Sequence, residues 1–510
     1  MNALYTIDEI RAVEQAALAG LPCGTLMQRA GQSAAKLALT LLPAESKNTA
    51  ILVLAGPGNN GGDALELASV LALSGLQVTI LLFADKTKQP PDAINALRKA
   101  ENSPASLMDE ASIKDAQSVL YSRRWSLVVD GLFGIGLKKA IAGDLRELIT
   151  AVNTLSCPVL ALDTPSGLDP DTGAIASETE DGSGIAIRAT HTITFIGDKP
   201  GLHTLHGRDH AGHVHVANLG IDTCLFTPPR CRLNDLSLFS GCLQKRMHHS
   251  HKGSFGNVVI VGGARGMSGA PILAARTALQ CGAGRVYAAF LENAPTYDSM
   301  QPELMFRTSA GFDFSTAIPV AGPGLGRSSA AAELLKNVLK TNQSLILDAD
   351  ALNLVADNPA LQESLIQRSQ GTLITPHPLE AARLLGVTSG DVQSDRLNAA
   401  RRLANRFNAT TVLKGSGTVI ASPGGETVIN PNGNPGLATA GSGDVLSGIC
   451  GALLAQGWPV WETALGAVWT HGKAADDLIR QGIGPIGLTA SELIPSIRAC
   501  LNKLTENSSN

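Results

Sequence analysis

A short run of glycine and serine followed by an acid opens an apolar helical stretch in the last quarter of the chain. The sequence AGSGD, residues 440–444, precedes VLSGICGALLAQG. Backbone amides at a helix N-terminus bind anions, and the helix dipole lies behind them. A carboxylate beside such a site can take the proton of a hydroxyl that attacks a phosphoryl group. The pattern predicts phosphoryl transfer with Asp444 as the base, and the alternative is an acid that only caps the helix.

Two further polar residues of the same half lie in segments rich in glycine or proline. Lys414 begins KGSGT, residues 414–418, and could hold a phosphate group; the alternative is an exposed loop lysine. His377 lies between two prolines in TPHPLE, residues 375–380, so its position is rigid. A structural histidine with satisfied hydrogen bonds is the alternative for His377.

A glycine loop of another kind lies near the N-terminus. The sequence GPGNNGGD, residues 56–63, follows an apolar run, opens a helix and contains G-x-G-x-x-G, with Asp85 near the end of the next apolar run. This pattern is typical of a Rossmann dinucleotide site, although a tight turn without a ligand gives the same pattern. The loop is not a P-loop because no Gly-Lys-Ser/Thr follows it. Asn59, Asn60 and Asp63 add side-chain oxygens, which favour a hard cation.

Two more loops follow apolar runs in the first half of the chain. Asp130 ends a run in VVDGLFGIG, residues 128–136, and Asp163 ends another in LDTPSGLD, residues 162–169. Each acid taken alone could merely cap the next helix. In a parallel sheet, however, all three loops lie at the carboxyl ends of strands, where α/β folds bind ligands. We therefore expect one composite site built from these loops.

The elements that position these residues alternate between short apolar runs and helical stretches. This alternation predicts two α/β units with parallel sheets covered on both faces. In the first unit, helices are expected over 7–42 and 63–74 and strands over 51–55, 78–83, 126–130, 158–163 and 190–195. In the second, strands are expected over 257–262, 317–321, 344–348, 372–375, 411–413 and 418–421, with helices over 269–282, 328–340 and 443–456. The expected boundaries are a first domain over 1–222, a linker over 223–244, a second domain over 245–503 and a disordered tail over 504–510.

Composition narrows the class of protein. The chain has 510 residues, of which 44% are hydrophobic and 16% charged, and its formal net charge is -4. This balance predicts a globular protein with no strong field for nucleic acid or anionic lipid. The 8 cysteines are scattered, which indicates reduced thiols and a cytoplasmic location. No stretch reaches the roughly 18 apolar residues of a membrane span, and the N-terminus has no signal-peptide pattern.

Histidines are concentrated in the middle of the chain, between His191 and His251. Imidazole suits zinc, copper and nickel, so a metal site is one interpretation. No cysteine or carboxylate lies at a structural-zinc spacing nearby, which favours surface or core histidines with ordinary hydrogen bonds. The segment from Lys245 to Lys252 is basic enough to attract phosphates.

Four strings of the first half resemble the NAD(P)H-hydrate epimerase family over about residues 1–222. They are GNNGGD (58–63), VVDGLFGIGL (128–137), LDTPSGLD (162–169) and THTITFIGDKPGL (190–202). The resemblance implies a Rossmann-like domain with a potassium ion on Asn60, Asp130 and Ser166, and Asp163 as the general acid and base. It implies that the hydrated nucleotide contacts Asn59, Asn60, Gly61, Gly62, Asp63, Gly134, Ile135, Gly136, Leu137, Lys138, Lys139, Ala140 and Asp163. Ala64 and Ser69 stand where the family usually has glycine and arginine.

Strings of the second half resemble the ADP-dependent NAD(P)H-hydrate dehydratase family, which has a ribokinase-like fold. They are LDADALN (347–353), TPHPLE (375–380), VLKGSGT (412–418) and NGNPGLATAGSGDVLSG (432–448), and the resemblance covers about residues 245–500. Leu379 replaces a more usual glycine. The resemblance implies that the hydrated nucleotide contacts Ala270, Gly324, His377 and Asp444. It implies that the adenine nucleotide contacts Lys414, Gly415, Ser416, Gly417, Thr418 and Gly443, and that magnesium accompanies the phosphates.

Together the two resemblances imply the repair of hydrated NADH and NADPH. The first domain would interconvert the R and S epimers. The second would convert the S epimer to NAD(P)H: Asp444 deprotonates the hydroxyl, which attacks the terminal phosphoryl group of ADP, and phosphate then leaves, with AMP as the other product. No nucleic acid or membrane partner is expected, and ribokinase-like relatives suggest a homo-oligomer.

Three other functions fit parts of the pattern. A vitamin or sugar kinase fused to a nucleotide-binding domain accounts for Asp444 and its loop equally well. A binding or regulatory protein with an inactive first domain has support only from Ala64 and Ser69. An oxidoreductase that uses residues 56–61 would need a hydride-acceptor site, and the sequence presents none.

Overall fold

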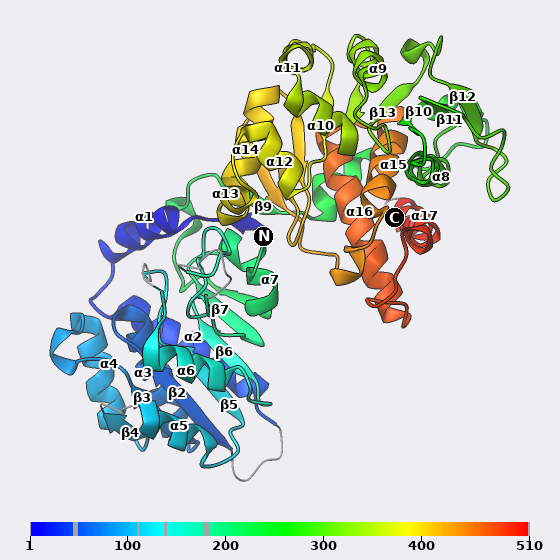
Figure 1. Cartoon of the computed structure of the whole chain (residues 1–510). Helices are drawn as coiled ribbons and strands as arrows, with labels where there is room; N and C mark the ends of the chain where they lie inside the picture. Colours follow the sequence, from blue (N-terminus) through cyan, green and yellow to red (C-terminus); the bar gives the residue numbers. More distant parts are fainter. Residues whose placement is uncertain (1, 44–48, 110–112, 137–139, 177–183, 508–510) are drawn as a thin grey trace. The chain divides into compact units, whose positions relative to one another are not determined.

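The computed structural model of the chain describes residues 2–43, 49–109, 113–136, 140–176 and 184–507 (Figure 1). These residues form two compact units: one runs from Ala3 to Cys231, and the other begins at Arg232 and includes Asn2. In the described ranges, no helix is both long and apolar enough to cross a membrane.

The first unit contains a fully parallel sheet with the strand order β4-β3-β2-β5-β6-β7-β8. The order reverses at β2, which lies between β3 and β5, and ligands of open α/β sheets bind beside such a switch point. The strands are β2 (Ala50–Ala55), β3 (Gln77–Leu82), β4 (Ser106–Asp109), β5 (Leu127–Gly131), β6 (Val159–Leu162), β7 (His191–Phe195) and β8 (His213–Ala217); the short β1 (Ala3–Leu4) begins the chain.

Helices cover both faces of this sheet, so every residue of β2 is buried. Ile51 and Val53 belong to the core formed with α1, α2, α3 and α4, whereas Leu52 and Leu54 belong to the core on the opposite face. This alternation is the reason that the strand reads as a continuous apolar run. The helices are α1 (Ile7–Leu18), α2 (Thr25–Leu41), α3 (Asn59–Leu73), α4 (Pro91–Glu101), α5 (Ile113–Tyr121), α6 (Gly143–Val152) and α7 (Gly207–His210). The doubly wound sheet predicted for this half is confirmed.

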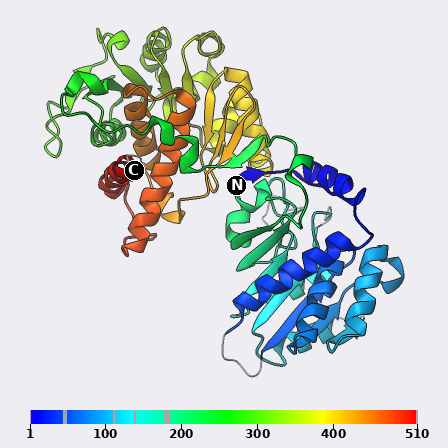
Figure 2. The same ribbon diagram turned by 180° about the vertical axis from the view of Figure 1, so that it is seen from behind.

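The second unit contains a larger, mixed sheet, which Figure 2 shows from behind. Its strands follow the order β9-β18-β17-β16-β15-β14-β13-β10-β11-β12. Pairing is parallel from β16 to β12 and antiparallel between β16, β17 and β18. The strands are β9 (Cys231–Leu233), β10 (Asn257–Gly262), β11 (Arg285–Phe290), β12 (Met305–Thr308), β13 (Ile318–Ala321), β14 (Leu345–Leu347), β15 (Thr372–Ile374), β16 (Thr410–Leu413), β17 (Val419–Ala421) and β18 (Thr427–Ile429).

One face of this sheet packs against α8, α15, α16 and α17, whose apolar residues form one core with Val258, Val320 and Val412 of the strands. This architecture agrees with the ribokinase-like α/β fold predicted for the second half. The helices are α8 (Gly269–Gln280), α9 (Ser329–Leu339), α10 (Ala349–Asp357), α11 (Pro359–Ile366), α12 (Pro378–Leu385), α13 (Ser389–Ser394), α14 (Arg396–Phe407), α15 (Ser442–Ala455), α16 (Val460–Arg480) and α17 (Ala490–Asn507).

Two expected boundaries differ from the structure. The segment expected as a linker, 223–244, contains β9, and its Phe239 is 1% exposed within the core of the second unit. Asn234 in the same segment donates to the backbone oxygen of Leu465 at 3.0 Å, so much of the segment belongs to the second unit. The disordered tail expected over 504–510 is wrong for its first residues, because α17 continues to Asn507 and Leu504 is buried. Residues 508–510 lie outside the described residues.

Candidate functional site

Three loops of the first unit meet where β2, β5 and β6 end. The backbone N–H of Gly56 donates to the oxygen of Gly131 at 3.0 Å, which joins the first loop to the second. A Cβ atom on Gly61 would lie 1.8 Å from the Gly56 oxygen, so only glycine fits there. Helix α3 begins at Asn59, earlier than the predicted residue 63, and GNNGGD therefore forms its first turn. The predicted convergence of these loops is present.

The three residues expected to hold potassium lie on these loops. The Asp130 carboxylate, fully buried, accepts hydrogen bonds from the Ser166 hydroxyl at 2.6 Å and the Ser166 backbone N–H at 2.8 Å. Burial raises the pKa of Asp130 to about 6 in spite of these bonds. Asn60 is 8% exposed, and within the described part of the chain neither polar atom of its side chain has a hydrogen-bond partner. An unpartnered buried amide oxygen and a buried carboxylate on adjoining loops are suited to bind a cation.

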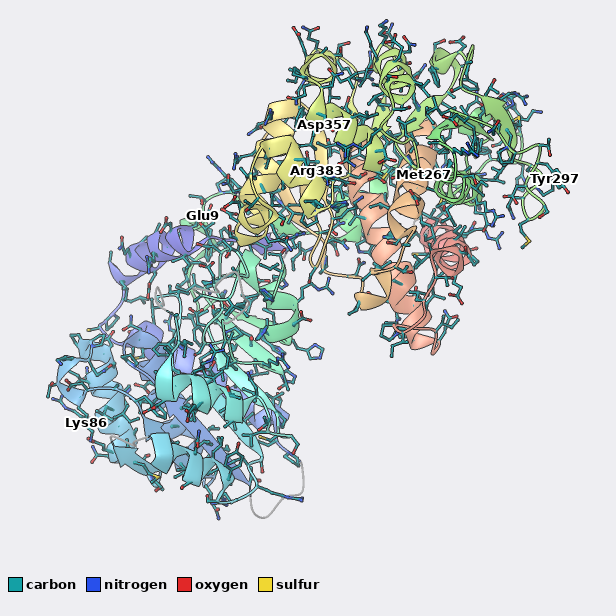
Figure 3. All side chains as sticks on the ribbon, viewed as in Figure 1. Glu9, Lys86, Met267, Tyr297, Asp357 and Arg383 are labelled. Atoms are coloured by element: carbon teal, nitrogen blue, oxygen red, sulfur yellow. The ribbon has the colours of Figure 1, made fainter. Side chains whose placement is uncertain are left out.

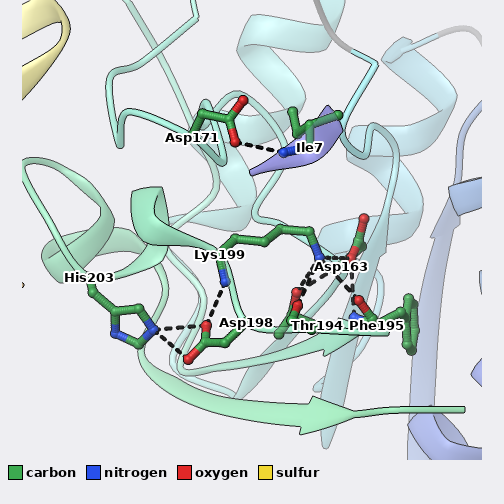
Figure 4. Close-up of polar contacts among 9 residues, drawn as sticks. Ile7, Asp163, Asp171, Thr194, Phe195, Asp198, Lys199 and His203 are labelled. Carbon is green, nitrogen blue, oxygen red and sulfur yellow. Dashed lines mark hydrogen bonds and ion pairs between the residues drawn. The ribbon is translucent and has the colours of Figure 1, made fainter. Parts of the chain in front are cut away.

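Asp163, the predicted acid and base, lies at the end of β6 with a backbone φ of 63°. Such a conformation is unusual for a residue with a side chain and is found most often at functional sites. One oxygen, Oδ1, accepts from the Lys199 ammonium at 2.7 Å and from the Phe195 backbone N–H at 3.2 Å (Figure 4). The Asp163 side chain is 14% exposed, so it can still reach a ligand.

Lys199 is a candidate residue of this site that the sequence did not single out. Its side chain has no exposed surface, and its ammonium also donates to the Thr194 hydroxyl at 2.6 Å and the Phe195 oxygen at 3.3 Å (Figure 4). A buried ammonium paired with a partly open carboxylate is the arrangement expected of an acid–base pair. The string GDKPGL after a buried strand is the signal that could have identified it.

Two further acids face Asp163. Burial, then the charges of Asp163, Glu14 and Glu66, raise the pKa of Asp63 well above its ordinary value. The pKa of Glu14 is raised by burial and then by Asp163. Burial and mutual repulsion therefore both disfavour the charged forms of Asp63 and Glu14.

The remaining residues predicted for this site divide into two groups. Gly134 lies against Asn60, since a Cβ atom there would be 3.2 Å from the Asn60 Cβ. Ile135, Gly136 and Ala140 belong to the same loop, whereas Leu137, Lys138 and Lys139 lie outside the described residues. Ala64 packs against Gly131, and the Ser69 hydroxyl faces the Lys99 backbone oxygen at 3.5 Å, so neither departure from the family pattern disturbs the loop.

Two histidines of the middle segment have ordinary hydrogen-bond partners, whereas Nε2 of His215 is buried without one among the described residues. His203 contacts Asp198 at 2.9 Å, and His210 contacts the Ile187 oxygen at 2.9 Å. Among the residues that the structure describes, no group of three or more His, Cys, Asp or Glu could hold a metal ion. The metal interpretation of this segment is therefore not supported.

In the second unit, the predicted anion site lies at the first turn of α15. Gly441 adopts a left-handed conformation, with φ of 89°, and no side chain caps the helix that follows it. Asp444 lies in this first turn. Burial is the main cause that raises its pKa to about 7, the charge of Asp348 adds to the rise, and Lys414 opposes it. A carboxyl group with this pKa suits a general base near neutral pH.

Lys414 lies beside this helix terminus at the end of β16. Its ammonium donates to Asp348 Oδ1 at 2.7 Å, and Glu380 Oε2 is 4.0 Å away. A Cβ atom on Gly443 would be 3.4 Å from the ammonium nitrogen, so the lysine and the glycine are adjacent. The structure brings together Lys414, Gly443 and Asp444, as the sequence predicted.

Arg396, which sequence reasoning did not identify, supports the backbone of residues 414–418. It is fully buried at the start of α14 and donates to the backbone oxygens of Leu413 and Lys414, both at 3.2 Å. A Cβ atom on Gly415 would lie 2.9 Å from the guanidinium, which explains the glycine. The Thr418 hydroxyl donates to the Gly415 oxygen at 3.1 Å and closes the turn.

His377 has a structural role in addition to any contact with substrate. Its Nδ1 accepts from the backbone N–H groups of Leu379 and Glu380, at 3.2 and 3.3 Å, and so caps α12. The Glu380 carboxylate in turn accepts a hydrogen bond from the His377 backbone N–H at 2.8 Å, and together these bonds form a capping box. The imidazole is 45% exposed.

Gly324 and Ala270 lie on neighbouring segments. A Cβ atom on Gly324 would be 2.4 Å from the Met267 oxygen, just before α8, and Ala270 is the second residue of that helix. Asp350 accepts a hydrogen bond from the backbone N–H of Gly326 at 2.9 Å. This bond connects the loop to Asp350, one of the acids that raise the pKa of Asp444. Met267 is 48% exposed (Figure 3).

Comparisons with known proteins agree with both halves of this description. Residues 258–498 match the family model described as NAD(P)H-hydrate dehydratase, and residues 23–201 match the model of the YjeF-related protein N-terminus. The bifunctional NAD(P)H-hydrate repair enzyme of Coxiella burnetii is 37% identical over 98% of this chain and 100% of its own length. The enzyme of the same name from Escherichia coli is 35% identical over 98% of this chain and 94% of its own.

Among solved structures, the ADP/ATP-dependent NAD(P)H-hydrate dehydratase of Bacillus subtilis, co-crystallised with ATP/Mg2+, is 27% identical with a TM-score of 0.48. It matches 53% of this chain and 98% of that protein. The relatives from Coxiella burnetii and Escherichia coli match along nearly the whole of both chains, and the two family models fall on the two units. The chain therefore belongs to the family of bifunctional NAD(P)H-hydrate repair enzymes, which combine an epimerase with a dehydratase.

Proposed function

We propose that Asp163 and Lys199 carry the acid–base chemistry of the epimerase. Inverting the hydrated ring carbon requires a hydroxyl group to leave and water to return on the other face, and each step moves a proton. The carboxylate of Asp163 can take and give that proton, while the Lys199 ammonium, 2.7 Å away, holds the carboxylate in position. The observation that carries this proposal is a fully buried ammonium joined to the one acid at the end of β6 that retains exposed surface.

We further propose that potassium binds Asn60, Asp130 and Ser166. The unpartnered Asn60 amide and the buried Asp130 carboxylate support this assignment. The ion would supply positive charge beside the phosphate groups of the substrate, next to the amides of the α3 terminus. The substrate would contact residues 59–63, residues 134–140 and Asp163.

Potassium is expected to stabilise the first unit. A ligand that binds only the native state raises the melting temperature, so KCl should raise the midpoint of this unit above its value in choline chloride of equal ionic strength. Asn60→Ala should abolish that difference and lower the epimerase rate at least about tenfold, the scale of a lost ligand contact. Asn102→Ala, at the exposed end of α4, is the control. Equal midpoints in both salts for the parent protein would contradict the assignment.

For the dehydratase we propose that Asp444 removes the proton from the substrate hydroxyl as its oxygen attacks the terminal phosphoryl group of ADP. The bond between that phosphorus and the bridging oxygen breaks, and AMP leaves. Phosphate then departs from the ring carbon, and loss of a proton from the neighbouring carbon restores the dihydronicotinamide. Lys414 and the amides around Gly443 would hold the phosphoryl group in transfer, with His377, Gly324 and Ala270 on the substrate.

ADP is the proposed donor, and magnesium would reach the site with the phosphates. Phosphate oxygens usually supply several ligands of such an ion, with carboxylates and waters as the others. The oxygen-rich surroundings of the α15 terminus fit this requirement, and the Bacillus subtilis enzyme was co-crystallised with ATP/Mg2+. Incubating the protein with hydrated NADH and ADP, and measuring the return of reduced-nicotinamide absorbance and the formation of AMP, tests this function against that of a small-molecule kinase.

The dehydratase is expected to lose activity as the pH falls through neutrality. The pKa of Asp444 is raised to about 7, so below this value the carboxyl group holds a proton and cannot take another. The kcat/KM for the S epimer should therefore fall about tenfold for each pH unit on the acidic side and reach a plateau above it. The initial rate in buffers of constant ionic strength measures this. A flat profile across one pH unit on either side of neutrality would contradict the role of Asp444.

A further inference from the structure

A second buried carboxylate, Asp348, lies behind the proposed base. It follows β14 directly and is 1% exposed. Its Oδ1 accepts from the Lys414 ammonium at 2.7 Å, and its Oδ2 accepts from the Ser447 hydroxyl at 2.6 Å. Because Lys414 ends β16 and Ser447 lies in α15, one carboxylate joins three separate elements of the fold at the helix terminus.

The backbone holds Asp348 firmly at this point. Its backbone N–H donates to the backbone oxygen of Ala321 at 3.0 Å. A Cβ atom on Gly322 would lie 1.7 Å from the backbone oxygen of Asp348, so the chain is closely packed here. The next residue, Ala349, has a φ of 48°, a conformation that costs an alanine energy. Strain of this kind persists where the surroundings fix the chain, and it is commonest at functional sites.

We propose that Asp348 is a positioning residue of the dehydratase that holds the Lys414 ammonium against the first turn of α15, where the phosphoryl group is transferred. This inference rests on the proposed function of the second unit. A free lysine side chain has many rotamers, whereas a hydrogen bond of 2.7 Å to a buried carboxylate restricts the positions of the Lys414 ammonium. The positive charge is then in place before the nucleotide binds, which is the condition for effective electrostatic stabilisation of a transition state.

The same carboxylate acts on Asp444. The charged groups that face Asp444 are Asp348, Asp350 and Lys414, and Glu380 of α12 faces that lysine at 4.0 Å. His471 of α16 also borders Lys414, and burial lowers its pKa to about 4, so it is neutral. Replacing Asp348 by a neutral residue removes a charge that raises the pKa of Asp444, while Lys414, which lowers that pKa, remains. The substitution therefore shifts the Asp444 pKa downwards.

The test is Asp348→Asn in the full chain, alone and combined with Lys414→Met. Asp348→Asn should lower the dehydratase kcat by about 10- to 100-fold, with a smaller change in the KM for ADP. The acidic limb of its rate profile should move to lower pH. Since Asp348 acts through Lys414, the double variant should have the same kcat as Lys414→Met alone.

The control is Asp298→Asn, which breaks another buried ion pair of this unit, between Asp298 and Arg276 of α8 at 2.6 Å. It should lower the melting temperature and leave the kcat per folded molecule and the pH profile unchanged. If Asp348→Asn behaves in this same way, the residue is only structural and the inference is wrong. A dehydratase that retains its full rate in Asp444→Asn would instead contradict the proposed function itself, so the two failures are distinguishable.

Discussion

Replacing Asp444 by asparagine is expected to lower the rate of ADP-dependent dehydration by about 10²- to 10⁴-fold, the range for loss of a general base. Asparagine has nearly the same shape and leaves the α15 terminus intact, but it cannot accept the proton of the substrate hydroxyl. Binding of ADP should change little because the amides and Lys414 remain. The initial rate of AMP formation with the S epimer measures the effect.

The epimerase activity of the same variant is the internal control. Asp444 belongs to the second unit, so Asp444→Asn should still interconvert the R and S epimers at the parent rate. A preparation that lost both activities would indicate misfolding. Full dehydratase activity in a well-folded Asp444→Asn protein would mean that another group takes the proton.

The strands that sequence analysis identified are those buried on both faces. β2, β6, β10 and β14 are continuous apolar runs between helices, a pattern that a parallel sheet produces directly. The strands it omitted lie toward the edges of the sheets. β12 reads MFRT with two exposed residues, and β4, SLMD, is the outermost strand of its sheet. An edge strand needs less apolar surface, so its sequence carries a weaker signal.

Residues of the site were predictable where their chemistry depends on local sequence. Asp444 and Gly443 lie in one helix turn, and the loop of residues 56–63 forms its own turn, so spacing alone identified them. Lys199 and Arg396 are buried and contact partners 36 and 17 residues away, and the local sequence does not show which groups they contact. The capping box of His377 and Glu380 is a local pattern, and its H-x-x-E spacing could have been recognised.

Asp348 occupies the same position relative to its strand as two of the predicted site residues. It follows an apolar strand in LDADALN, just as Asp130 and Asp163 do in their own strings. A carboxylate in that position faces the ligand edge of a parallel sheet in both units. The pattern that indicated Asp163 therefore also indicates Asp348, and the structure adds its ion pair with Lys414 at 2.7 Å.

The second large effect is expected from Asp163→Asn, which should lower the epimerase rate by about 10²- to 10⁴-fold and leave dehydration of the S epimer unchanged. The amide can neither protonate the departing hydroxyl group nor take a proton from the returning water. With ADP present, a mixture of epimers should then be consumed in two phases, in which the S epimer disappears at the parent rate and the R epimer remains. The parent protein should consume both.

The loss of activity in Asp163→Asn must be separated from a loss of stability, because the substitution leaves the Lys199 ammonium buried without a counter-charge. Removing one partner of a buried ion pair costs about 3–5 kcal/mol, so the melting temperature of the first unit should fall. Asp171→Asn is the control: Asp171 accepts from the Ile7 backbone N–H at 2.8 Å (Figure 4), and burial raises its pKa to about 6. It should lower the melting temperature without altering the epimerase rate.

The double variant Asp163→Asn with Lys199→Met removes both charges, so it should recover stability but not epimerase activity. Recovery of both would mean that the pair is only structural, and would overturn the assignment of Asp163 as the acid and base.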